Sequence, residues 1–388
     1  MRLLLSAFFI LLTNAHCTAA PAPTPTPDPC PVESAWGDVL TLARAGLAAP
    51  PALAVLPDQQ IALAYVTSDG TGARQVMRRW INAALTEPIT LTLPPIQPRA
   101  QTAFPALAGG VFVLWIDLDE TSRQPGLFSA LIAPTSEIVR GPLRLSAENE
   151  RVYDYAAVRS PDGSLWVAWS GARTNEANLT LRRIDNDGRP GQPIPLAADA
   201  LHPALIGADD GSLWVLYEQG TGDGVIRALV YDGTLIESAR IAGRVSRTPG
   251  TLIHSLYAAA DATGTGYLFW NLTRDDGRRE TWLSTGSLTG FAWSPPELLP
   301  APYAWARPLN DPAQRAVSAA VSSTEDQALG IVLFNQGQIF AAEMVTRCTP
   351  VIDPPALYAS PDALILAWSR PRQNAPADLQ ITLRQNGG

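Results

Sequence analysis

The sequence contains no lysine, because all 28 of its basic residues are arginine. This absence excludes chemistry that needs a lysine amine, such as Schiff-base catalysis, pyridoxal phosphate attachment and Walker-type nucleotide loops. Histidine is nearly absent as well, with three residues. A histidine-rich zinc site cannot be assembled from so few, and we expect no metal and no cofactor. The net charge of −8 also argues against nucleic acid or an anionic membrane as a partner.

The first thirty residues have the composition of a targeting segment and a tether. Residues 1–20 begin with Arg2 and a nearly continuous apolar run, which is too short to span a bilayer and is typical of a secretory signal peptide. Residues 21–31 alternate proline with small residues and are expected to form a stiff, extended linker. We therefore expect an exported protein, secreted or at the cell surface, with no transmembrane segment once the signal is removed.

Cysteine is scarce, and its three positions support export. If the signal is cut near Ala20, Cys17 leaves with it, and Cys30 and Cys348 remain as an even pair. We predict a disulfide between Cys30 and Cys348; two free thiols are the alternative. Cys17 is also a candidate for lipidation, since it follows the apolar run and precedes the tether. The residues before it depart from the usual lipoprotein pattern, and simple secretion is favoured over a lipid anchor.

An aromatic residue closes a short apolar strand seven times along the chain, at intervals of about fifty residues. These aromatic residues are Tyr65, Trp115, Trp169, Tyr217, Trp270, Phe334 and Trp368. A period near fifty that is carried by strands is typical of a β-propeller with one four-stranded sheet per repeat. The sequence therefore predicts an all-β, seven-bladed β-propeller over residues 32–388, which we expect to be a monomer.

Each repeat can be divided into strands. A run of small residues opens it and is predicted to be the innermost strand, because large side chains would collide where the sheets converge on the axis. These seven runs are residues 51–56, 104–109, 155–160, 202–207, 256–261, 317–322 and 355–360. A turn and the aromatic-ended strand follow. The last repeat ends after its third strand, residues 379–385, so we predict that residues 39–43 complete the seventh sheet and close the ring.

Two segments carry a resemblance to a known family. Residues 160–169 (SPDGSLWVAW) and 208–217 (ADDGSLWVLY) resemble the sialidase-like (BNR-repeat) propellers of exported bacterial proteins. The family's Asp box has a different spacing and lies in a different turn, so the resemblance is one of architecture. It implies the propeller architecture of exported bacterial proteins. The family's catalytic arginines, tyrosine and carboxylates do not map onto positions here, and none is assigned.

Propeller geometry indicates where a ligand would bind. The loops before each first strand and after each second strand share one face around the axis, and this face is expected to gather several polar residues. The ligand-binding candidates are Arg99, Arg151, Tyr153, Asp154, His202, His254 and Arg315. Arginine beside carboxylate suits a polar or anionic ligand, since the guanidinium binds carboxylates bidentately. The alternative is that these are ordinary solvated loop residues.

Two functions remain after these exclusions. The favoured one is a non-enzymatic exported propeller that binds a protein or glycan partner on its axial face. The alternative is a sialidase-like glycoside hydrolase or a polysaccharide lyase that uses paired carboxylates, Asp154 with Asp117 or Glu120. No catalytic signature in the sequence decides between them.

Overall fold

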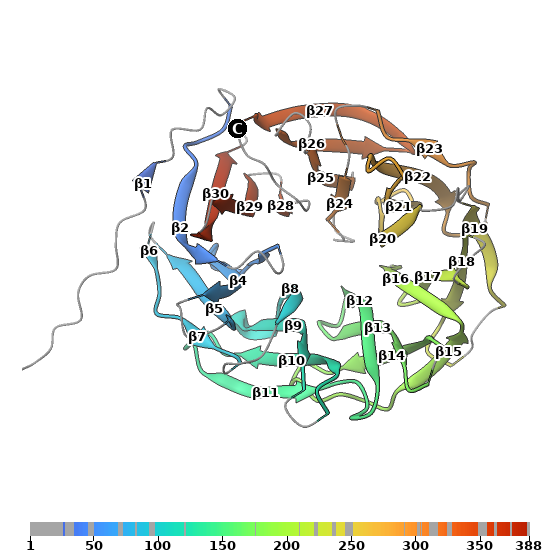
Figure 1. Cartoon of the computed structure of the whole chain (residues 1–388), viewed down its shortest axis with the longest axis horizontal. Helices are drawn as coiled ribbons and strands as arrows, with labels where there is room; N and C mark the ends of the chain where they lie inside the picture. Colours follow the sequence, from blue (N-terminus) through green and yellow to red (C-terminus); the bar gives the residue numbers. More distant parts are fainter. Residues whose placement is uncertain are drawn as a thin grey trace, which may run out of the picture.

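The computed structural model describes most of the predicted propeller. The described residues are 26–27, 35–45, 50–68, 73–81, 84–92, 98–119, 122–174, 176–208, 210–220, 224–234, 238–244, 251–290, 292–300, 303, 305–309, 317–323, 328–347, 355–360, 363–372 and 375–385. Their strands form seven antiparallel sheets that stand around a central axis, so the chain is a seven-bladed β-propeller (Figure 1). The fold predicted from the sequence is confirmed.

The first four blades follow one another along the chain, each beginning at the axis. Blade 1 contains β3 (Ala52–Val55), β4 (Ile61–Ser68), β5 (Ala73–Ile81), β6 (Ala84–Leu85) and β7 (Ile89–Thr90). Blade 2 contains β8 (Arg99–Pro105), β9 (Val111–Leu118), β10 (Pro125–Ile132) and β11 (Ile138–Arg144), with the short 3₁₀ helix η1 (Leu107–Gly109) after β8. Blade 3 contains β12 (Arg151–Arg159), β13 (Leu165–Ala172), β14 (Asn178–Ile184) and β15 (Ile194–Ala198). Blade 4 contains β16 (Ala200–Gly207), β17 (Leu213–Gln219), β18 (Val225–Tyr231) and β19 (Arg240–Arg244).

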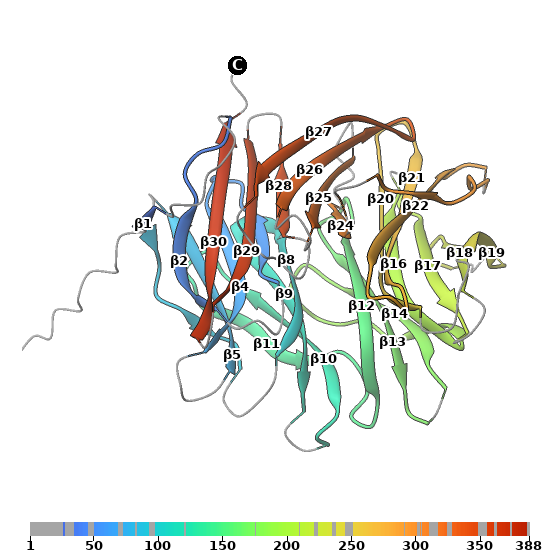
Figure 2. The same ribbon diagram turned by 45° about the horizontal axis from the view of Figure 1, so that its top comes forward.

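The remaining blades complete the ring (Figure 2). Blade 5 contains β20 (Leu252–Ala260), β21 (Thr265–Thr273), β22 (Arg279–Ser287) and β23 (Glu297–Leu298). Blade 6 contains β24 (Trp305–Pro308), β25 (Val317–Ser323), β26 (Ala328–Asn335) and β27 (Gln338–Thr346). Blade 7 contains β28 (Ala356–Ala359), β29 (Ala363–Arg372) and β30 (Ala375–Gln385), followed outward by β2 (Leu40–Ala45) and β1 (Thr26–Pro27) from the start of the chain.

The N-terminal strand closes the ring as predicted. β2 pairs antiparallel with β30, with Leu40 opposite Ile381 and Ala45 opposite Ala377. The carboxylate of Asp378, on β30, accepts a hydrogen bond from Arg44 on β2 at 2.9 Å. The first and last parts of the chain therefore share one sheet, and the ring is closed within blade 7.

The seven periodic aromatic residues are the cores of the blade interfaces. Each is at most 3% exposed and belongs to the apolar cluster between its own blade and the preceding one. Trp115, for example, packs with Ala54 and Met77 of blade 1, and Tyr65 packs with Ile365 and Ile381 of blade 7. The period in the sequence thus arises because each interface contains one of these large buried side chains. The role of the seven aromatic residues is structural.

Blade 6 differs from the strand assignment predicted from the sequence. The small-residue run 317–322 is the second strand of this blade, because β24 lies inside β25 in the sheet order. Phe334 therefore ends the third strand rather than the second. The reason lies in packing: Ala319 and Val321 of β25 share a cluster with Tyr267 and Phe269 of blade 5, and small residues leave room for those rings.

Several predicted features lie outside the described residues. These are Cys17, Cys30, Cys348, Arg315 and Glu120. The disulfide, the lipidation site and the signal peptide therefore stay predictions. In the part of the chain that the structure describes, no helix is long and apolar enough to cross a bilayer.

Candidate functional site

The inner strands of all seven blades surround a cavity of about 640 Å³ on the axis. This volume lies within the usual range of small-molecule sites, about 300–1,000 Å³. Much of the wall consists of the small residues that the sequence places on inner strands, including Ala54, Ala103, Ala156 and Ala258. Their short side chains leave the space open, and the few larger side chains that line the cavity therefore define its chemistry.

The inner strands of four consecutive blades each contain a β-bulge near their first residues. The pairing of each with the second strand shifts register between Arg99 and Thr102 on β8, between Val152 and Asp154 on β12, between Leu201 and Ala204 on β16, and between Ile253 and Ser255 on β20. A bulge redirects side chains locally and is over-represented beside functional sites. The candidate residues on β8, β12, β16 and β20 cluster at these bulges.

Two of the bulges hold a residue with left-handed backbone. Ala100 and His202 both have φ near 49°, which is uncommon for residues other than glycine. The phenol of Tyr155 holds the first of these bulges in place, since its hydroxyl donates to the carbonyl of Ala100 at 2.5 Å. Burial raises the pKa of Tyr155, so this hydroxyl stays protonated and keeps its donor role. Strain of this kind persists where the surrounding structure enforces it, commonly at binding sites.

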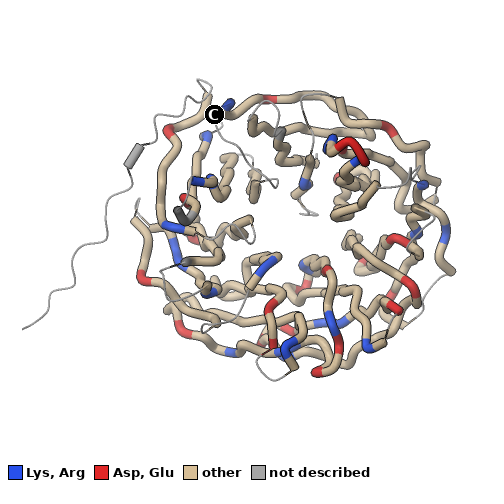
Figure 3. Tube along the Cα trace, viewed as in Figure 1, with Lys and Arg blue, Asp and Glu red and all other residues tan. Residues whose placement is uncertain are grey.

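Two arginines enter the cavity from opposite parts of the ring. Arg99 begins β8 in blade 2, and Arg307 lies on β24 in blade 6, where its guanidinium is 5.8 Å from the centroid of the Tyr257 ring. Figure 3 shows basic positions on both of these strands, on opposite sides of the central opening. Within the described residues, neither guanidinium forms an ion pair with a carboxylate. Arg159 adds a third cationic side chain to the cavity wall.

A glutamine beside Arg99 has unused hydrogen-bonding capacity. Gln101 lines the cavity but is only 1% exposed, and its Nε2 donates to the carbonyl of Pro50 at 2.5 Å. Its Oε1 accepts no hydrogen bond from the described residues. A buried acceptor without a donor costs free energy, about 1–3 kcal/mol.

The carboxylate that lines the cavity, Asp154, is linked to a histidine and to a second carboxylate. Its Oδ2 is 3.2 Å from Nδ1 of His202 on the neighbouring blade. The other ring nitrogen, Nε2, is 3.9 Å from Oε2 of Glu218, whose side chain is fully buried. The imidazole thus lies between two carboxylates, with one ring nitrogen facing each. We call Asp154, His202 and Glu218 the imidazole bridge.

His254 lies on the next blade and has a different environment. Its Nε2 is 2.8 Å from the hydroxyl of Thr273, and its ring centroid is 5.1 Å from that of Trp305. Burial lowers the pKa of His254 first, and the positive charges of Arg279 and His202 lower it further. This histidine therefore favours its neutral form, and it does not line the cavity.

The structure gathers some of the predicted site residues and separates others. Arg99 and Asp154 line the cavity, and His202 contacts Asp154. Arg151 instead lies 5.4 Å from the centroid of the Tyr153 ring, and both side chains are exposed outside the cavity. The sequence missed Arg307 because the inner strand of blade 6 was assigned to residues 317–322. Gln101 carried no signal in the sequence.

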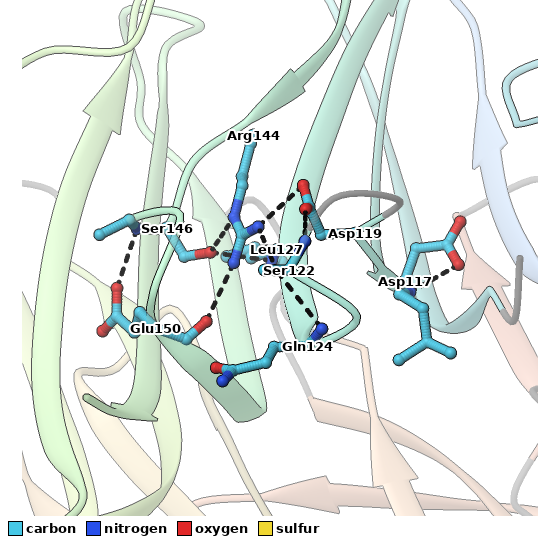
Figure 4. A network of polar contacts seen from close by, with 10 residues as sticks. Asp117, Asp119, Ser122, Gln124, Leu127, Arg144, Ser146 and Glu150 are labelled. Atoms are coloured by element: carbon cyan, nitrogen blue, oxygen red, sulfur yellow. Dashed lines mark hydrogen bonds and ion pairs between the residues drawn. The ribbon is translucent and has the colours of Figure 1, made fainter. Parts of the chain in front are cut away.

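The predicted catalytic pairing of Asp154 with Asp117 is not supported. Asp117 is 3% exposed, does not line the cavity, and accepts a hydrogen bond from the amide of Leu118 at 2.8 Å. The neighbouring Asp119 binds Arg144 at 2.9 Å, in a network that joins blade 2 to the start of blade 3 (Figure 4). Hydrogen bonds from Ser122 and Arg144 lower the pKa of Asp119. These contacts of Asp119 are therefore structural, and it is Arg144 that reaches the start of blade 3.

Solved structures with a similar fold include proteins of different activities. An ulvan lyase from a polysaccharide lyase family superposes with a TM-score of 0.58 and 11% identity, over 88% of this chain and 94% of its own. A protein of unknown function from Dyadobacter fermentans (TM-score 0.54, 10% identity) matches over 91% of this chain and 100% of its own. The WD40 domain of coronin from Toxoplasma gondii (TM-score 0.54, 11% identity) matches over 92% of this chain and 86% of its own.

No family model matches the sequence, and neither does any curated protein. At such identities the structural likeness shows the fold alone. The resemblance to sialidase-like propellers therefore holds for the architecture, and the activity must be argued from the site.

Proposed function

We propose that this protein binds an acidic saccharide in the axial cavity. The observation that carries the proposal is the pair of arginines, Arg99 and Arg307, which line one cavity and form no ion pair within the described residues. In a chain with a net charge of −8, the described lining of the cavity holds three arginines, Arg99, Arg159 and Arg307, and one carboxylate, Asp154, so the cavity is locally positive and suits an anion. A carboxylate or sulfate group matches the guanidinium fork.

Other groups in the cavity favour a saccharide over a simple anion. Tyr257 and Tyr358 line the wall and supply aromatic surface, against which a pyranose can pack. A similar fold has been solved as an ulvan lyase bound to -[GlcA(1-4)Rha3S]-, an acidic saccharide. We further propose export of the chain, with residues 1–20 as the signal peptide and residues 21–31 as the linker.

Binding without cleavage is the form of this function that the geometry favours. Both ring nitrogens of His202 face carboxylates, so neither is directed at a ligand in the cavity. Cleavage of the same saccharide is a second candidate, because Asp154 lines the cavity and has Glu218 behind it. Turnover that is lost in Asp154→Ala while binding persists would establish the enzymatic function instead.

The test is a binding screen of the mature protein against acidic and neutral oligosaccharides, including the glucuronate–rhamnose-3-sulfate repeat. Acidic members should bind, and Arg307→Gln and Arg99→Gln should each weaken binding by about 1.5–3 kcal/mol, the scale of a charge-assisted hydrogen bond. The matched control is Arg189→Gln, in the exposed turn between β14 and β15. If both cavity variants bind like wild type, the cavity is not the site.

A further inference from the structure

We propose that protonation of His202 controls the affinity of the axial cavity, so that an anionic ligand binds more tightly when the imidazole is charged. The inference rests on the proposed function and names the regulation of the same site. It follows from the imidazole bridge, which connects Asp154, the one carboxylate among the described residues of the cavity wall, to a fully buried carboxylate behind it.

The charged groups around His202 come from three neighbouring strands. β12 provides Asp154 at 3.2 Å, β17 provides Glu218 at 3.9 Å, and β20 carries His254. Within the described residues, the ion pairs of His202 are with these two carboxylates. Arg279 interacts electrostatically with His254 and lies 4.5 Å from the centroid of the Trp305 ring.

The charge of the imidazole bridge affects the affinity of the cavity for an anion. Protonation of His202 makes the imidazole bridge one unit charge more positive, whatever the charge of the two carboxylates. Histidine is the side chain whose charge ordinarily changes between about pH 5 and 8. The more negative state repels an anionic ligand at Arg99 and Arg307, so affinity falls as the pH rises. By linkage, ligand binding takes up protons.

The local backbone keeps the imidazole in this position. His202 lies in the bulge of β16 with φ near 49°, and Pro203 follows it. The side chain is about one-fifth exposed, so the ring exchanges protons with solvent while remaining between the carboxylates. A protonation event there changes the field at Asp154 without needing a conformational change.

His254 provides the matched control. Burial and the nearby positive charges lower its pKa, so it becomes charged only under more acidic conditions. Its side chain contacts Thr273 and Trp305 rather than a carboxylate. A variant at this position should therefore leave the pH dependence of binding near neutrality unchanged.

The experiment measures the Kd of a glucuronate tetrasaccharide between pH 5.5 and 8.0 by calorimetry. The carboxyl groups of this probe stay ionised throughout, since such groups titrate below about pH 4. Affinity should fall roughly tenfold across the range, the order of magnitude expected for a change of one unit charge beside the site. His202→Asn should abolish the dependence, and asparagine tolerates the left-handed backbone. His254→Gln should retain it.

A second readout uses the wild-type protein alone. Calorimetry in two buffers of different ionisation enthalpy should show net proton uptake on binding near neutral pH. Binding that is independent of pH, or that takes up no protons, overturns the role of His202 while leaving the proposed function intact. Retention of the full pH dependence in His202→Asn overturns it as well. Absence of binding at every pH refutes the proposed function and, with it, this inference.

Discussion

Replacement of Trp36 tests whether the N-terminal segment holds the ring closed. Trp36 precedes β2 and is 5% exposed, in a cluster with Leu329 and Val345 of blade 6 and Leu366 of blade 7. Its indole nitrogen donates to Glu343 Oε1 at 2.8 Å. One side chain near the start of the chain thus contacts two blades near its end.

The expected effect follows from these contacts. Trp36→Ala removes a large buried side chain and should lower the free energy of unfolding by about 3–5 kcal/mol. Trp36→Phe keeps most of the packing but loses the hydrogen bond to a carboxylate, which should cost about 1.5–3 kcal/mol. A loss of 3–5 kcal/mol is a large fraction of the stability of a typical protein, about 5–15 kcal/mol.

The assay is denaturant unfolding of residues 21–388, followed by circular dichroism and by tryptophan fluorescence. Coincident transitions by the two probes justify a single free energy of unfolding. Phe340→Ala on the outer strand β27 is the control, because that side chain is 57% exposed and its removal should change stability by less than about 0.5 kcal/mol. If Trp36→Ala is no more destabilising than Phe340→Ala, residues 35–45 do not close the ring.

Two other predictions concern acid stability and the cysteines. Burial alone would raise the pKa of Asp261, but hydrogen bonds from Thr263 and Tyr267 lower this pKa overall. The ionised carboxylate therefore stabilises the fold above about pH 4, and this contribution is lost as the pH falls. Asp261→Asn should cost about 1–3 kcal/mol at pH 7 and less at pH 3, and an equal loss at both would contradict this. Cys30 and Cys348 should be disulfide-bonded in the exported protein, and two labelled thiols under denaturing, non-reducing conditions would exclude the bond.

The sequence predicted the ring because one physical requirement repeats in it. Every blade interface needs a large buried side chain, and this need is met at similar intervals by Trp115, Trp169, Tyr217 and Trp270. The rule failed in blade 6 for a local reason. There Phe334 fills the interface from the third strand, and its ring centroid is 5.4 Å from that of Phe269. The second strand has small side chains, which leave room for these rings. A run of small residues therefore indicates a strand that packs closely against its neighbours. Such a strand can lie at the axis, or it can lie against large rings within a blade interface.

The site was less predictable than the fold, because its geometry depends on departures from regular pairing. A strict two-residue alternation would not place Asp154 in the cavity wall and His202 against it, since each lies at or beside a register shift. The residue types mark those bulges poorly: alanine, as at Ala100, does not favour left-handed backbone, and histidine, as at His202, adopts it more often than most residues but far less readily than glycine.

The position of these irregularities supports the assignment of the site. The bulges occur in blades 2 to 5, on the strands that carry Arg99, Asp154 and His202, and each disrupts the sheet pairing locally. Bulges are over-represented beside functional sites, and these four lie on strands that line the axial cavity. Two of them also hold a residue with left-handed backbone, which commonly persists where a site enforces it.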